Sequence, residues 1–420
     1  MVKFVHCSDL HLDTPFKGLT RRDPAHAERQ RKATTESFSR IIDLCIERNA
    51  DFLIIAGDIY DSANRSVATQ IGFAKELARL EERGVHVFIA CGNHDPLSDW
   101  LPAAKLPENT CRFVSERVER VRLERDGQVL ADVYGISFAE ERVTENLASM
   151  FTLANDPAPV SIAVLHGTVG AAGPHERYSP FRVEDVETKG FDYWALGHIH
   201  KHSIVREAYP SIVYPGNPQG RDFGETGPKG CVYVEIEARS PPSVEFVPTQ
   251  TIRFEDVTVD ISGEEDYERL ASLQEELPRR VADYDPESGY VFRIRLEGRT
   301  PLDSDLRREG EAEALVEQMN GSAAGPEGAA YVDRIEVRTR PDVDLDAIRA
   351  SGDFAAEVLK LSDGLRSDPE ELHALFEEVG AEFRYGAARR EIGTIGADRM
   401  NEILEESTMK LLGRLLEDAE

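Results

Sequence analysis

Residues that commonly bind divalent metals recur directly after several apolar segments of this sequence. In chain order, the clusters are Asp9 with His11, Asp58, Asn93 with His94, His166, and His198 with His200. A single DxH or GD pair arises often by chance and carries little information. Five such clusters, each ending a strand-like run, indicate one shared site, because strand ends are where α/β sheets build their sites.

The residue types point to a metal centre that acts on phosphate esters. Imidazole and carboxylate ligands suit Mn, Fe and Zn. Two such ions about 3.5 to 4 Å apart can share a carboxylate and clamp the attacking and leaving oxygens of a phosphoryl group. Asp9 and Asp58 would return only two negative charges to two divalent ions. The remaining positive charge would attract a phosphate diester and stabilise its transition state.

The pattern of apolar residues in the first 250 positions predicts the scaffold for these clusters. Short apolar runs such as DFLIIAGD and SIAVLHG alternate with helical patterns such as TESFSRIIDLCIERN and VATQIGFAKELARLEERG. This alternation predicts an α/β sandwich. The segment VRLERDGQVLADVYGI predicts a hairpin turned at Asp126-Gly127, so that the sheets are mixed.

The pattern changes after residue 250. Residues 251–341 read β-α-β-α-β, which predicts a small α+β capping domain, and residues 342–420 are helical. We therefore expect three parts: 1–250, 251–341 and 342–420. The last part ends in a stripe of Met400, Ile403, Leu404, Leu411, Leu412, Leu415 and Leu416. That stripe could bind a partner helix or pack within the chain.

Composition limits the possible partners and compartment. The net charge of -29 argues against a surface that attracts nucleic acid everywhere, so that any DNA contact must be local. No apolar run approaches the roughly 18 residues of a membrane span, and MVKFVHCSD lacks a signal-peptide pattern, which predicts a cytoplasmic protein without membrane contact. The five cysteines form no CxxC, so neither a disulfide framework nor a thiolate zinc site is indicated.

The motif blocks DxH, GDxxD, GNHD, H and GHxH, in this order, resemble those of the calcineurin-like metallophosphoesterases. The resemblance implies a two-sheet α/β sandwich, flanked by helices, that holds two divalent ions. It assigns one ion to Asp9, His11, Asp58 and His200, and the other to Asp58, Asn93, His166 and His198. Asp58 would bridge the ions, metal-activated water would attack, and His94 would assist as general acid or donor to the phosphoryl oxygens.

Longer strings resemble the DNA repair exonuclease branch of that family, its SbcD-like and especially its YhaO-like bacterial proteins. These strings are HCSDLHLDTPF, AGDIYDSANRS, HERYSP, YWALGHIHKH and YPGNPQGR. The resemblance implies a Mn-dependent 3'-5' exonuclease, with endonuclease action as a further option and Fe or Zn as alternative ions. It also implies DNA, an SMC-like coiled-coil ATPase of the SbcC or YhaN type, and a homodimer as partners.

Two other functions are alternatives to a DNA nuclease. A phosphodiesterase or phosphatase for small phosphoesters, such as cyclic nucleotides, would need the same blocks but leaves the long C-terminal extension unexplained. A non-catalytic scaffold for an ATPase predicts a degraded metal site, whereas every block is intact here.

Several further residues have two readings each. His202 is expected to support the site or lie at the surface, and His6 to be a core or supporting histidine. Asp13 and Asp61 could orient ligand histidines or cap turns. Substrate contacts could come from His175 and Arg177 in a glycine-rich loop, from Asn217 and Arg221, and from Arg21 and Arg22 in a basic segment; each could equally belong to a surface loop, a turn or a solvated helix.

Overall fold

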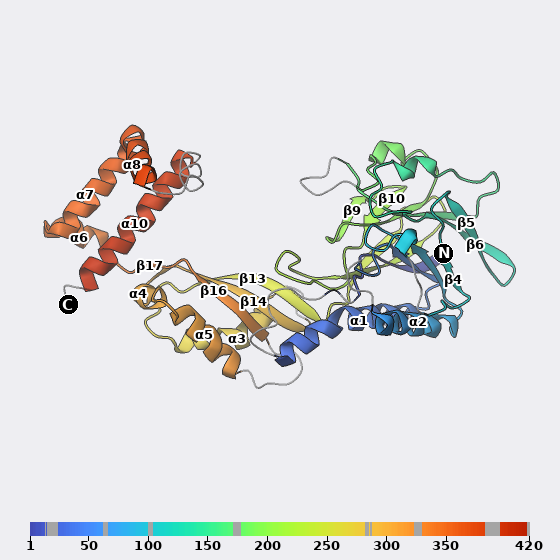
Figure 1. The fold of residues 1–420 in the computed structure, drawn as a ribbon, viewed down its shortest axis with the longest axis horizontal. Coiled ribbons are helices and arrows are strands. Elements are labelled where there is room, and N and C mark those ends of the chain that lie inside the picture. The colour runs from blue at the N-terminus through green and yellow to red at the C-terminus, as the bar shows by residue number, and fades with distance from the viewer. Residues whose placement is uncertain are drawn as a thin grey trace. The chain divides into compact units, whose positions relative to one another are not determined.

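Two six-stranded β-sheets form the N-terminal part of the computed structural model (Figure 1). The structure describes residues 1–12, 14, 24–61, 66–99, 104–170, 178–281, 285, 288–322, 330–382 and 395–417. The chain divides into two compact units, the first comprising Met1–Glu255, Asp283–Val291 and Pro326–Ala329, the second Asp256–Ala282, Phe292–Gly325 and Ala330–Glu420. Among the helices in the described ranges, none has the length and apolar character that a membrane crossing requires.

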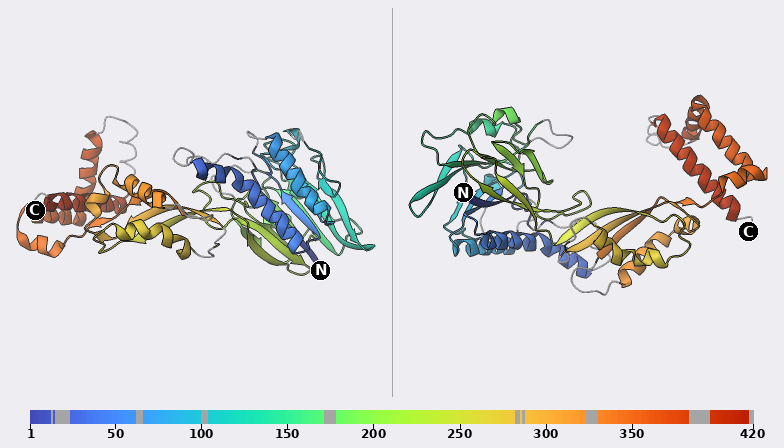
Figure 2. Two further views of the ribbon diagram at one scale, coloured as in Figure 1. Left: turned by 90° about the horizontal axis from the view of Figure 1, so that it is seen from below. Right: turned by 180° about the vertical axis from the view of Figure 1, so that it is seen from behind.

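The first sheet has the strand order β12-β11-β1-β2-β3-β4. Its strands are β1 (Val2–Cys7), β2 (Phe52–Ala56), β3 (His86–Ala90), β4 (Thr110–Arg112), β11 (Gly230–Ile236) and β12 (Ser243–Pro248). Strands β1 to β4 run parallel, whereas β11 pairs with β1 in the antiparallel sense. Helices α1 (Pro24–Glu47) and α2 (Val67–Glu81) lie side by side on this sheet (Figures 1 and 2).

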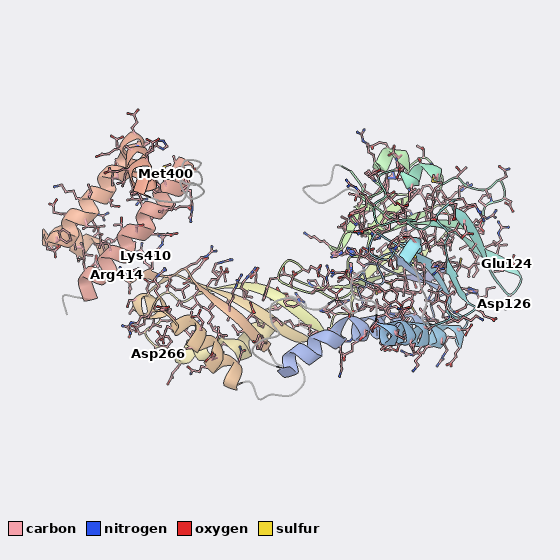
Figure 3. All side chains as sticks on the ribbon, in the orientation of Figure 1. Glu124, Asp126, Asp266, Met400, Lys410 and Arg414 are labelled. Atoms are coloured by element: carbon pink, nitrogen blue, oxygen red, sulfur yellow. The ribbon has the colours of Figure 1, made fainter. Side chains whose placement is uncertain are left out.

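The second sheet has the order β5-β6-β7-β8-β10-β9. Its strands are β5 (Glu119–Arg125), β6 (Gln128–Ile136), β7 (Val160–His166), β8 (Tyr193–Gly197), β9 (Ser203–Arg206) and β10 (Ser211–Tyr214), and short 3-10 turns cover Leu97–Asp99, Leu147–Met150 and Val183–Asp185. Strands β5 and β6 form the predicted hairpin, with Asp126 and Gly127 at positive φ in its turn (Asp126 is labelled in Figure 3). Both sheets are mixed, so that the predicted two-sheet α/β sandwich is confirmed.

The main core lies between the two sheets. In β2, Phe52, Ile54 and Ala56 face the second sheet, while Leu53 and Ile55 pack beneath α1 and α2. A strand buried on both faces needs apolar residues at consecutive positions, which explains the unbroken run FLIIA. Side chains of β1 and β8 meet in this core.

The predicted β-α-β-α-β pattern lies mostly in the second unit. Strands β13 (Ile252–Asp260), β14 (Gly289–Glu297) and β16 (Ala330–Val337) form a sheet that α3 (Glu268–Arg280) and α5 (Glu311–Ser322) cover; α4 (Asp303–Leu306) and the short strands β15 (Arg299–Thr300) and β17 (Arg340–Pro341) complete this part. Helices α6 (Leu345–Ser351), α7 (Phe354–Ser367), α8 (Pro369–Glu382) and α10 (Ala397–Glu417) follow.

Part of the apolar stripe of the terminal helix packs within the chain. Met400 and Leu412 of α10 are buried in clusters with α8 and α7, respectively, whereas Leu411 is exposed (Met400 is labelled in Figure 3). Intramolecular packing therefore accounts for part of the stripe. Binding of a partner through the exposed remainder stays a prediction.

Replacing Phe4 by alanine should lower the free energy of unfolding of the first unit by about 3–5 kcal/mol, because the change leaves a cavity between the two sheets. The Phe4 ring stacks on Phe52 with centroids 4.9 Å apart and meets the edge of Tyr193 at 5.2 Å. Urea titration followed by circular dichroism measures the loss. Val205→Ala, at an exposed position of β9, is the control and should change stability by no more than about 0.5 kcal/mol. Equal losses in the two variants would contradict this account of the core.

Candidate metal centre

The topology brings the predicted clusters to one end of the two sheets. Strands β1, β2 and β3 are neighbours and parallel, so the residues that follow them share an edge; β7 and β8 are likewise parallel neighbours. The segments after β1 and β2 are bonded to each other, with the Asp9 N–H donating to the Gly57 carbonyl at 2.9 Å and the His11 N–H to the Asp58 carbonyl at 3.0 Å. The carboxyl ends of five strands therefore converge.

One group of donor atoms comprises Asp9, His11 and His200. The Nε2 atoms of His11 and His200 are 3.2 Å apart, and His200 Nε2 lies 3.7 Å from Asp9 Oδ1. Asp9 and His11 are 1% exposed. These atoms are within 4.8 Å of one another, which is the spacing that a single ion could span.

A second group comprises Asp9, Asp58 and His166. His166 Nε2 lies 3.4 Å from Asp58 Oδ2 and 3.0 Å from Asn93 Oδ1. The same Asp58 oxygen is 4.0 Å from His11 Nε2, in the first group. Asp9 belongs to both groups, and an oxygen of Asp58 lies between His11 and His166.

The protonation of His166 provides a test of whether these residues fit a cation. Burial lowers the pKa of His166, which favours a neutral ring with one proton. That proton belongs on Nδ1, because Nδ1 lies 2.9 Å from the Ala56 carbonyl, which can only accept. Nε2 then presents a lone pair toward the oxygens of Asn93 and Asp58. Acceptors that face one another in a buried site are satisfied by a cation, so the donor set fits a bound metal.

The pKa values of the two buried carboxyl groups shift in opposite directions. Burial, together with the charges of Asp9 and Asp95, raises the pKa of Asp58 well above its usual range. Burial also acts to raise the pKa of Asp9, but its neighbours, with His200 the largest contributor and the Ser8 hydroxyl among them, outweigh burial and lower that pKa. A divalent ion would be the largest local charge and would favour the ionised form of both carboxyl groups.

Backbone strain is concentrated at the same residues. Asp9, His11, Asp58 and His198 have φ values of 54°, 43°, 54° and 103°, in the left-handed region that residues with a Cβ rarely adopt. Gly57 has φ +97°, and a Cβ there would overlap the His166 ring. Strained residues persist where the surrounding structure holds them, which is typical of functional sites.

His94 and His198 lie at the margin of the two groups. The His94 N–H donates to Asp58 Oδ1 at 2.9 Å, while its side chain is 40% exposed and its Nδ1 is 3.4 Å from Asp61. The His198 N–H donates to Asp9, and its ring packs against those of His166 and Tyr178. In the described part of the chain neither ring belongs to the two donor groups. Asp61 contacts His94, and Thr14 contacts Asp61.

His6 and His202 are held by other partners. His6 is fully buried, with its ring between the Tyr193 hydroxyl and the Leu196 carbonyl, and burial lowers its pKa to about 3. The His202 ring stacks on Phe246 and its Nδ1 is 3.0 Å from the Tyr214 carbonyl. His6 is therefore a core histidine, which is one of its two expected readings, whereas a supporting role for His202 stays a prediction.

The expected substrate contacts are only partly within the described residues. Arg21, Arg22, His175 and Arg177, and also Asp13, lie outside them. Asn217 is 1% exposed, and its amide donates to Glu225 and to the Gln219 carbonyl. Arg221 bonds to Glu225 beside His200. Their contact with substrate stays a prediction.

Two carboxylates, the buried Asp95 and the partly buried Glu225, organise the site, although sequence reasoning did not single them out. Asp95 accepts the N–H groups of Asp58, Ile59 and Gly92, and so joins the segments that follow β2 and β3. Glu225 lies 2.7 Å from His200 Nδ1. Asp95 stands inside the block GNHD, directly after His94, and its position next to ligand types was the available signal. Glu225 carried no comparable local signal.

The chain is similar to known phosphoesterases over both units. Residues 2–202 match the family described as calcineurin-like phosphoesterase, and residues 254–340 match the middle domain of the metallophosphoesterase YhaO. DNA double-strand break repair protein Mre11 of Sulfurisphaera tokodaii is 24% identical over 82% of this chain and 84% of that protein. One component of the nuclease SbcCD of Bacillus subtilis is 23% identical over 54% of this chain and 64% of that protein.

A further relative shows the family. The uncharacterized metallophosphoesterase YhaO of Bacillus subtilis is 32% identical over 343 residues, which make up 81% of this chain and 83% of that protein. The chain therefore belongs to the calcineurin-like phosphoesterase family.

Proposed function

We propose that this chain is a dinuclear-metal phosphodiesterase that acts on DNA, as a Mn-dependent 3'-5' exonuclease with endonuclease action as an option. The observation that supports it most directly is the pair of donor groups that share Asp9, with the oxygen of Asp58 between His11 and His166. Adjacent groups joined by carboxylates are the arrangement that two neighbouring ions require.

The proposed ligand sets are those that the family motifs imply, and the two donor groups support them in part. Asp9, His11, Asp58 and His200 would hold one ion; Asp58, Asn93, His166 and His198 would hold the other. When bound, two divalent ions would act as Lewis acids on the phosphoryl oxygens and make a water molecule a better nucleophile. Nitrogen and oxygen donors suit Mn, with Fe and Zn as alternatives.

His94 is the proposed proton donor or hydrogen-bond donor toward the substrate. Its ring meets that of His11 at a centroid distance of 4.9 Å but remains 40% exposed, so that it borders the site without belonging to the donor groups. Asp61, 3.4 Å from Nδ1, would orient the ring with Nε2 toward the phosphoryl group. A positioned imidazole can transfer a proton to the leaving oxygen near neutral pH.

The choice of DNA as substrate is supported by the names of the relatives. Two of them are described as a DNA double-strand break repair protein and a nuclease component. Small phosphoesters would use the same residues and are the alternative outcome of the assay below. A non-catalytic scaffold is less consistent with a donor set whose members are all present.

The proposal includes partners. An SMC-like ATPase would bind the C-terminal helices, where Phe354 and Leu361 of α7 are exposed apolar residues. The proposal also includes that the chain forms a homodimer and is located in the cytoplasm. These assignments follow from the family resemblance and from one relative whose name makes it part of a larger nuclease.

Incubation of the full chain with end-labelled linear DNA and Mn²⁺ should release nucleotides from 3' ends. Asp58→Asn keeps the size of the side chain but removes the charge between the two donor groups. It should lower the rate by about 10²–10³-fold, the usual loss when one charge-stabilising group is removed. Chelation should abolish activity and added Mn²⁺ should restore it.

A small chromogenic phosphodiester is the comparison substrate in that assay. If the small diester is hydrolysed while the DNA remains uncut, the result argues against DNA as the substrate but still supports the metal centre. Equal activity of the Asp58→Asn protein would identify a contaminating nuclease.

Replacing His94 by glutamine should reduce kcat by roughly 10²–10⁴-fold, the usual contribution of a positioned acid or base. Binding of Mn²⁺, measured by calorimetry, should remain near the wild-type value because His94 lies outside the donor groups. The control is His202→Gln, whose ring contacts Phe246 and the Tyr214 carbonyl. Loss of metal binding in the His94 variant would instead make it a ligand.

A further inference from the structure

One segment after β10 contacts both the ring and the backbone of His200. Glu225 Oε1 lies 2.7 Å from His200 Nδ1. The His200 carbonyl accepts from Lys229 Nζ at 2.8 Å and from the Asn217 N–H at 3.3 Å. Lys229 is 7% exposed, so its ammonium group is directed into the protein. His200 is therefore fixed at two points by residues 217–229.

The hydrogen bond at the ring sets which nitrogen faces the donor group. An ionised carboxylate can only accept, so His200 Nδ1 must donate to Glu225. Arg221 Nη2 is 3.1 Å from the same nitrogen but donates to Glu225 Oε1 at 2.6 Å, so the imidazole and guanidinium N–H groups share that oxygen. Nε2 of His200 is left facing His11 and Asp9.

Glu225 is itself held in place. Its Oε2 accepts from Asn217 Nδ2 at 2.9 Å, from the Arg221 N–H at 2.9 Å and from Arg221 Nε at 3.2 Å. The Glu225 side chain is 12% exposed. A carboxylate with both oxygens engaged in this way has one orientation, and it transmits that orientation to the imidazole.

We propose that Glu225 is a positioning residue that directs His200 Nε2 toward a metal ion, and that Arg221, Asn217 and Lys229 hold this arrangement. A carboxylate behind a ligand histidine fixes the ring and increases its basicity as a ligand. The inference deepens the proposed function and rests only on its metal-binding part. In this inference Asn217 and Arg221 hold Glu225 in place, a role that does not require contact with substrate.

The test is calorimetric titration of Mn²⁺ into the metal-free full chain. Glu225→Met, which removes the acceptor, should weaken binding of one of the two ions by about 10- to 100-fold. Glu225→Gln keeps an oxygen that can accept from Nδ1, and should bind with intermediate affinity. Asp222→Asn is the matched control, because it removes the same charge from an exposed residue of the same segment, and it should bind as the wild type does.

A second variant separates positioning from simple destabilisation. Glu225→Met leaves the Arg221 guanidinium partly buried without its carboxylate, which can destabilise the fold. The double variant Arg221→Met/Glu225→Met removes both charges and leaves the net charge of the site unchanged. We expect the double variant to melt near the wild-type temperature without metal and still to bind the affected ion at least about tenfold more weakly.

Two results would overturn the inference: wild-type affinity in Glu225→Met, or recovery of wild-type affinity in the double variant. A wild-type protein that binds no Mn²⁺ would overturn the metal centre and this inference together. Failure to cut DNA leaves the titration unaffected, so it would count against the proposed substrate alone.

Discussion

Buried carboxyl and imidazole groups gathered at one position are the constraint around which this site is built. His166 Nε2 points at the oxygens of Asn93 and Asp58, and Asp9 is buried between both donor groups. Buried carboxylates and lone pairs are costly unless a cation compensates them. The fold holds this unfavourable set in place, which makes metal binding a source of stability for the first unit.

The rest of the first unit fixes the positions of these site residues. Parallel pairing of β1, β2 and β3 places three clusters at one sheet edge, and the interlocked segments after β1 and β2 fix Asp9 and His11 by backbone bonds. Asp95 adds three accepted N–H bonds that hold the backbone around Asp58. Left-handed φ values at several of these residues persist because the packed strands behind them cannot relax.

Much of this arrangement could be predicted from the sequence because its signals are local. The run FLIIA followed by a glycine and Asp58 marks both a doubly buried strand and the residue at its end, and the Asp126-Gly127 turn marks a hairpin. The role of Glu225 could not be predicted in this way. Its partner His200 is 25 residues away, and their contact depends on how the segment after β10 returns to the site. The second unit was predictable as an element pattern, since its helices and strands alternate regularly, but the pairing order β13-β14-β16 depends on tertiary packing.

The distribution of charge connects the site with the acidity of the whole chain. At physiological ionic strength electrostatic effects are screened over about 8 Å, so a net charge of -29 spread over the surface does not determine the potential at a buried centre. Two divalent ions held by Asp9 and Asp58 would leave that centre positive. Arg221 and Lys229 add two further cations beside His200, against the single carboxylate of Glu225. Attraction of an anionic phosphodiester is therefore expected to be local. It would act mainly on the scissile phosphate and much less on the other phosphates of the nucleic acid.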